Sequence, residues 1–218
     1  MLRVTEPMSG KNSVMLCLVT FLQFIWDGYT FLSLRYEVKL NGPSLIHASV
    51  YLAACMQFVG RDIDYLIPPF LKNKLVFCWD GSYCTEGWIY KQGKKSIVYS
   101  KDLRKLWQKG DPNLPWNKLY YNESNTLMLD VCPYRGMLNP RTTTVYPLPF
   151  NYHDNNDNSL AQGGELRAYL QGLTEVDDMR KYVKEHPFGQ EAINNASINW
   201  ITHSRYILEY RMDKTFFV

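Results

Sequence analysis

Two short apolar runs, each ending in an aspartate, constrain the fold of this chain most strongly. The run "KLVFCW" stops at Asp80, and the run "TLML" stops at Asp130. Continuous apolar runs of this length are typical of strands buried on both faces, and segments with helical periodicity lie between them. Alternating strands and helices predict an α/β domain with a parallel sheet covered on both sides.

The two aspartates fall where such a sheet binds its ligands, which is beyond the carboxyl ends of the strands. Lys101 is predicted in the first turn of a helix that follows a strand, where its ammonium and the backbone N–H groups favour an anion such as phosphate. Simpler interpretations stay open. Asp80 and Asp130 can cap turns, and Lys101 can be an ordinary exposed lysine.

The segment "SIVYSKDLRKLWQKG" predicts a strand followed by a short helix. The strand covers 97–99, Ser100 is the expected helix cap, and Gly110 is expected to end the helix. The expected apolar face of this helix consists of Leu103, Leu106 and Trp107.

Two further helices are predicted. The run "SLIHASVYLAACMQFVG" reads as a buried helix, and "TEVDDMRKYVKEHP" reads as an amphipathic one. In the second, Thr174 and Asp177 form a capping-box pattern and Pro187 ends the helix. The segment "TTTVYPLPF" is rich in strand formers before its prolines break it.

Composition excludes several classes of function. Of the 218 residues, 46% are hydrophobic, which is enough for one globular domain with a core. The net charge of +3 is spread over scattered lysines and arginines, so a nucleic-acid surface is not expected. Five cysteines without a C-x-x-C pair do not predict zinc, and they read as reduced thiols. The four histidines read as surface or turn residues (His47, His153, His186 and His203).

The run "VMLCLVTFLQFIW" looks a little like a secretory signal, but it is too short to span a membrane and contains Gln23. We therefore expect a buried strand or helix there and no membrane span.

Five blocks of the chain resemble one family. "KLVFCWDGSYCTEG", "YSKDLRKLWQKGDPNLPWNKLYYNESNTLMLD", "CPYRGMLNPRTTTVYPLPF", "DNSLAQGGELRAYLQGL" and "KYVKEHPFGQ" occur in the order typical of it. It comprises plant proteins with the homology domain of the phosphatases that act on the C-terminal domain of RNA polymerase II, the NLI-interacting-factor-like group of the haloacid dehalogenase superfamily. The presequence receptor of the mitochondrial inner-membrane translocase shares this domain.

The resemblance implies a fold and a division of the chain. Residues 1–57 would be a divergent N-terminal segment, 58–190 the C-terminal part of the homology domain, and 191–218 an extension. The implied fold is a three-layer, Rossmann-like parallel sheet of the haloacid dehalogenase type, with its N-terminal part incomplete or divergent.

The resemblance also assigns chemistry to two residues. Family members attack a phosphoserine or phosphothreonine ester with an aspartate, form an aspartyl-phosphate and use Mg²⁺. Lys101 matches the lysine that neutralises the phosphate, and Asp130 matches the first acidic residue of the metal-binding motif. Val131 and Cys132 depart from that motif, so an oxygen ligand for Mg²⁺ is missing.

The nucleophile motif, Asp-x-Asp followed by Thr, is not evident. Asp27 follows an apolar run, but Tyr29 stands where the second aspartate belongs. Asp62 and Asp64 have the right spacing but fall in a predicted helix. We therefore expect weak or no phosphatase activity.

Two alternatives remain. The chain can be a non-catalytic module that binds a phosphorylated protein or peptide, in the nucleus or cytoplasm. It can also be a mitochondrial import component that resembles the presequence receptor. In the first case a phosphopeptide is the expected partner, and in neither does nucleic acid bind directly.

Overall fold

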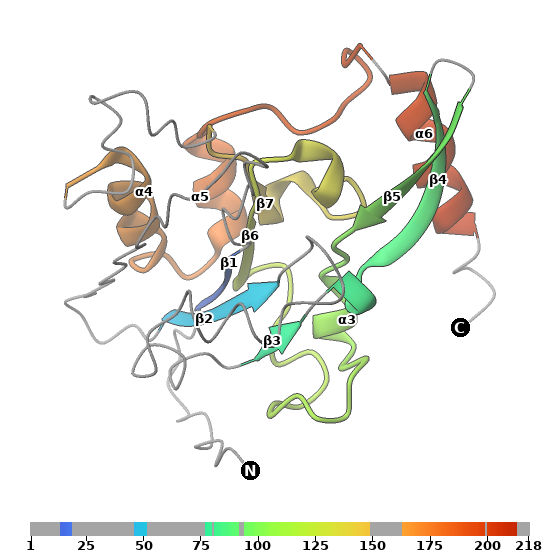
Figure 1. Ribbon diagram of the computed structural model, residues 1–218. Helices are drawn as coiled ribbons and strands as arrows, with labels where there is room; N and C mark the ends of the chain where they lie inside the picture. Colours follow the sequence, from blue (N-terminus) through green and yellow to red (C-terminus); the bar gives the residue numbers. More distant parts are fainter. Residues whose placement is uncertain are drawn as a thin grey trace, which may run out of the picture.

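The computed structural model of this chain is a mixed α/β structure with two sheets (Figure 1). It describes residues 14–18, 46–51, 77–79, 81–91, 94–148, 163–198 and 200–212. Within these ranges, three short 3₁₀ helices accompany the main elements: η1 (Gly81–Tyr83), η2 (Pro133–Gly136) and η3 (Arg141–Thr143).

The larger sheet has five strands in the order β3-β2-β1-β6-β7. Its strands are β1 (Val14–Leu18), β2 (Ile46–Tyr51), β3 (Cys78–Trp79), β6 (Thr126–Leu129) and β7 (Thr144–Val145). Every neighbouring pair runs parallel, which confirms the predicted parallel sheet. β1 is the central strand, so the first 57 residues contribute the middle of the sheet.

Both faces of the sheet are covered at β6, because its side chains alternate between two apolar clusters. Met128 packs in one cluster with Leu106 and Trp107 of α3 (Arg104–Trp107). Leu127 and Leu129 pack in another with α4 (Glu165–Leu173) and α5 (Met179–Glu185). The layering expected from the apolar run "TLML" is therefore present at this strand.

The smaller sheet is an antiparallel hairpin of β4 (Thr85–Lys91) and β5 (Lys94–Ser100). The predicted strand 97–99 lies within β5. The helix α6 (Trp200–Met212) lies along this hairpin (Figure 1). Its buried residues Tyr206 and Ile207 share a cluster with Val98. The C-terminal residues thus cover the hairpin.

The expected limits of the helix after β5 are wrong at both ends. α3 begins at Arg104 and not after Ser100, and the Lys101 N–H ahead of it donates to Arg135 O, outside the segment. Asp102 Oδ1 accepts the hydrogen bond from Arg104 N–H. At the other end Lys109, with φ of 53°, adopts the left-handed conformation expected of Gly110.

Two other helix predictions are corrected. The described part of "SLIHASVYLAACMQFVG" is the strand β2, whose apolar residues alternate with period two in "IHASVY". α5 is capped by Asp178, which accepts from Arg180 N–H at 2.9 Å, and not by Thr174. Thr174 instead ends α4, where its hydroxyl donates to Gln171 O.

Part of the apolar run at 14–26 is the strand β1, which agrees with the strand alternative of the prediction. Among the described helices, none has the length and apolar character needed to cross a membrane. The predicted residues Asp27, Asp62, Asp64 and Asp80 lie outside the described residues.

Candidate functional site

The candidate site lies where β6 ends beside β1. Leu18, the last residue of β1, pairs with Leu129, and Asp130 follows directly. The boundary between β1 and β6 divides the sheet: β2 and β3 lie beyond β1 on one side, and β7 lies beyond β6 on the other. Such a reversal of strand order opens a crevice at the carboxyl ends of the strands in open parallel sheets. Asp130 therefore stands at the position where this kind of sheet binds ligands.

Lys101 and Asp130, the two residues predicted for the site, contact each other directly. Lys101 Nζ donates to Asp130 Oδ2 at 2.9 Å, and both side chains are 0% exposed. The backbone reinforces this pairing, because Lys101 N–H donates to Arg135 O at 2.7 Å. The segment after β5 and the turn after β6 are thus joined by a buried ion pair and a main-chain hydrogen bond.

The second oxygen of Asp130 is also engaged. Oδ1 accepts from Cys132 N–H at 2.9 Å and lies 3.8 Å from Nη1 of Arg135. One carboxylate therefore faces two cations and a backbone donor. A buried carboxylate needs this degree of compensation to stay charged away from water.

Burial and charge shift the pKa values of both cations. Burial lowers the pKa of the Lys101 ammonium, although Asp130 opposes this effect by attraction and hydrogen bonding. Burial also acts to lower the pKa of Arg135, but Asp130, Cys132 and Tyr134 outweigh it and the pKa is raised. Arg135 is therefore a fixed cation, whereas Lys101 is a titratable one.

The described residues do not, in this arrangement, fit Mg²⁺. This ion requires near-octahedral coordination by oxygen. Asp130 Oδ2 holds Lys101, and Val131 O accepts from Gln190 Nε2 at 2.8 Å. No group of three metal-binding side chains occurs within the part of the chain that the structure describes. The expected Mg²⁺ role of Asp130 stays a prediction, and binding would require the pair with Lys101 to open.

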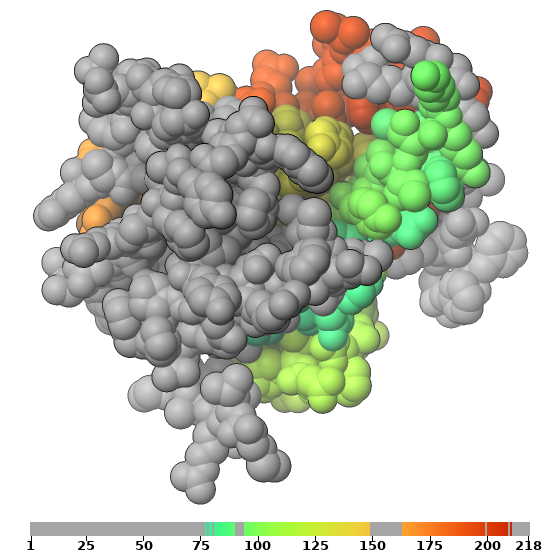
Figure 2. All heavy atoms as spheres, in the orientation of Figure 1, coloured from blue at the N-terminus to red at the C-terminus, as the bar shows by residue number. Residues whose placement is uncertain are grey.

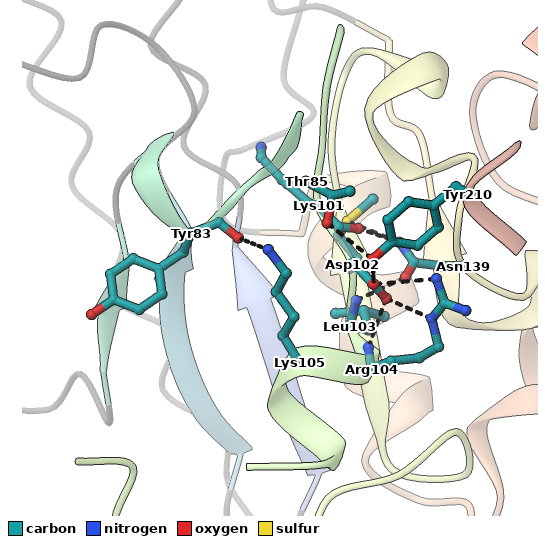
Figure 3. Close-up of polar contacts among 10 residues, drawn as sticks. Tyr83, Thr85, Lys101, Asp102, Leu103, Arg104, Lys105, Asn139 and Tyr210 are labelled. Carbon is teal, nitrogen blue, oxygen red and sulfur yellow. Dashed lines mark hydrogen bonds and ion pairs between the residues drawn. The ribbon is translucent and has the colours of Figure 1, made fainter. Parts of the chain in front are cut away.

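A second buried carboxylate, Asp102, follows Lys101 and was not predicted (Figure 3). It accepts from Arg104 Nε at 2.8 Å and from the hydroxyl of Tyr210 in α6 at 2.7 Å. The guanidinium of Arg104 also lies 5.1 Å from the ring centroid of Tyr210. The two-residue spacing of Asp102 and Arg104 in "DLR" is compatible with their ion pair. No sequence pattern could indicate that Tyr210 lies beside Asp102.

Asn139 holds the backbone on either side of Asp102 (Figure 3). Its Nδ2 donates to Lys101 O at 2.6 Å, and its Oδ1 accepts from Leu103 N–H at 2.8 Å. The side chain is buried. Asn139 therefore fixes the path of the chain that carries Lys101, a role that sequence reasoning also missed.

Two other predictions concern residues outside the pair. His203 is buried in α6, and burial lowers its pKa, so its prediction as a surface or turn residue is wrong. His186 is exposed at the end of α5, as predicted.

Comparison with models of known protein families and with curated protein sequences finds no match for this chain. The assignment of a function therefore depends on the residues and geometry described above.

Proposed function

We propose that this chain is a divergent relative of the haloacid dehalogenase phosphatases in which Lys101 and Asp130 form a structural ion pair, each needed to neutralise the other, and do not turn over phosphate esters. The topology supports the ancestry. Numbered along the chain, the parallel strands follow the order 3-2-1-4-5, which is that of doubly wound, Rossmann-like sheets. Asp130 lies at the reversal point of that order.

The contact between Lys101 and Asp130 is the observation that carries the proposal. Removing two charges from water costs several kcal/mol per ion, so two apolar residues would be at least as favourable here, whereas loss of one partner alone would leave a buried charge unpaired. A lysine and a carboxylate that formerly faced a phosphate and a metal ion would be left opposite each other once both ligands are lost. The separation of 2.9 Å and the complete burial of both side chains agree with this history.

The same contact supports low activity. Catalysis of phosphoryl transfer needs cations that are free to stabilise charge developing on the phosphate oxygens. Lys101 instead donates to Asp130, and its side chain is not accessible to solvent. Val131 and Cys132 also provide no further carboxylate. Asp27, Asp62 and Asp64 remain the predicted candidates for a nucleophile.

The proposal is tested by hydrolysis of para-nitrophenyl phosphate and a phosphoserine peptide with added Mg²⁺. We expect the chain and its Lys101→Met and Asp130→Asn variants to show the same background rate. Circular dichroism establishes that each variant is folded. Robust turnover that either substitution abolishes in a folded protein would contradict the proposal.

Retention of a phosphopeptide is the second candidate function, and Arg135 is the observation that favours it. Unlike Lys101, Arg135 reaches the surface, with 25% of its side chain exposed, while staying 3.8 Å from Asp130. Arginine is well suited to phosphate recognition. Equal recovery of phosphorylated and plain peptides, or recovery unchanged by Arg135→Gln, would exclude this function.

A further inference from the structure

A hollow of about 440 Å³ lies between β4 and α6. Four successive residues of β4, Glu86 to Ile89, line it. Because side chains of a strand alternate between its faces, a hollow that touches four successive residues abuts the edge of the strand. From α6, the lining residues are Ile201, Thr202, Arg205, Tyr206 and Tyr210.

The edge of β4 beside this hollow is an open one. Among the described strands, β4 pairs with β5 alone. In an antiparallel ladder alternate residues direct their N–H and C=O groups away from the partner strand. Within the described residues, the backbone of Glu86 and of Trp88 makes no backbone–backbone hydrogen bond to a third segment. Such an edge is a template for an added strand.

The walls of the hollow combine apolar surface with positive charge. The side chains of Trp88 and Ile201 are 43% and 82% exposed. Lys95 Nζ lies 3.9 Å from the ring centroid of Trp88, which holds the ammonium at the rim. Neither Lys95 nor Arg205 forms an ion pair with a described carboxylate, and Glu86 is the single acidic residue of the lining.

We propose that the free edge of β4 binds an acidic peptide in an extended conformation. The peptide backbone pairs with β4, one large apolar side chain enters the hollow against Trp88 and Ile201, and flanking carboxylates contact Lys95 and Arg205. The volume lies within the range of ligand pockets and exceeds what one apolar side chain needs. The excess of cations selects an acidic partner over a basic one. The hairpin lies at the surface of the molecule (Figure 2).

This inference goes beyond the proposed function and does not rest on it. The hollow is lined by the hairpin and α6, whereas Lys101 and Asp130 are buried at the end of the parallel sheet. Failure of either proposal therefore leaves the other intact.

Selection from a random peptide library displayed on phage, with the full chain as bait, tests the partner chemistry. We expect enriched peptides to carry a large apolar residue flanked by aspartates or glutamates. The double variant Lys95→Gln/Arg205→Gln should bind a synthetic enriched peptide about 3- to 10-fold more weakly, as expected for two exposed ion pairs. Lys118→Gln/Lys181→Gln, which changes two exposed lysines elsewhere, should bind it normally. No enrichment, enrichment of neutral or basic peptides, or equal binding by the first double variant would overturn the proposal.

The mode of binding is tested on the same synthetic peptide without altering the protein. Methylation of a backbone nitrogen removes a donor and blocks strand pairing. We expect methylation at alternate peptide positions to abolish binding and methylation between them to be tolerated. Tolerance at every position would contradict strand addition at β4.

Discussion

At the scale of single residues, Asp130 shows what sequence reasoning could and could not provide. The apolar run before it predicted a strand end, and the family resemblance paired it functionally with Lys101. The structure brings the two side chains to 2.9 Å. Their complete burial could not be predicted, because it depends on packing between segments distant in the sequence. The same limit applies to Asp102, whose partner Tyr210 lies 108 residues away.

Lys101 gives a pH-dependent prediction. Burial lowers its pKa below the ordinary value of 10.5, so the native state releases this proton at a lower pH than the unfolded chain. Between the two pKa values the unfolded state binds more protons, and the free energy of unfolding rises with pH. We expect the free energy of unfolding of the wild type, relative to Lys101→Met, to increase as the pH rises toward 10.5.

Urea denaturation at a series of pH values measures this difference. A relative free energy that is constant or falls over this range would show that burial does not dominate the pKa of Lys101.

At the scale of elements, uniformly apolar segments were the most predictable. "TLML" predicted β6, because a strand buried on both faces needs no periodicity. β7 lies in a segment that was predicted to be rich in strand formers, since threonine and valine are β-branched. α6 was not predicted, because its apolar residues lie on both buried and exposed faces. Tyr206 and Ile207 are buried, whereas Ile201 and Leu208 are exposed. Without a single apolar stripe, the usual signal of an amphipathic helix is missing.

The packing of α6 on β4 depends on Gly87. A Cβ atom at this position would overlap the ring of Tyr206, which has little room to move. We expect Gly87→Ala to lower the free energy of unfolding by about 1–3 kcal/mol, the usual cost of overpacking. In a Tyr206→Ala background the same substitution should cost much less. Equal costs in both backgrounds, measured by urea denaturation, would contradict this packing.

Tyr210 connects α6 to Asp102. Its hydroxyl donates to Asp102 Oδ2 at 2.7 Å, and the carboxylate is fully buried. Tyr210→Phe should therefore cost about 1.5–3 kcal/mol, the range for a hydrogen bond to a charged group. Tyr99→Phe is the matched control, because the hydroxyl of Tyr99 has no hydrogen-bond partner among the described residues. If thermal or urea denaturation gives the two variants equal stability, Tyr210 does not hold α6 through Asp102.

At the scale of the whole molecule, the two sheets are covered by different parts of the chain. The parallel sheet is covered by separate clusters at β6, and its central strand comes from the first 57 residues. The hairpin is covered by α6 from the other end of the chain. Lys101 follows the hairpin directly, and its bond to Asp130 joins the hairpin to the end of β6. Sequence patterns predicted the parallel sheet, but the packing of α6 on the hairpin is a tertiary arrangement that they could not indicate.

The central claim is that Lys101 and Asp130 have a structural role, in which each buried charge neutralises the other. A double-mutant cycle with Lys101→Met and Asp130→Asn tests it most directly, because asparagine keeps an acceptor for Cys132 N–H. Global unfolding in urea should show that each single variant loses about 3–5 kcal/mol, since it leaves a buried group without its partner. The double variant should lose clearly less than the sum. The account would be contradicted by small, additive losses in the free energy of unfolding, together with hydrolysis of phosphate esters that requires both residues.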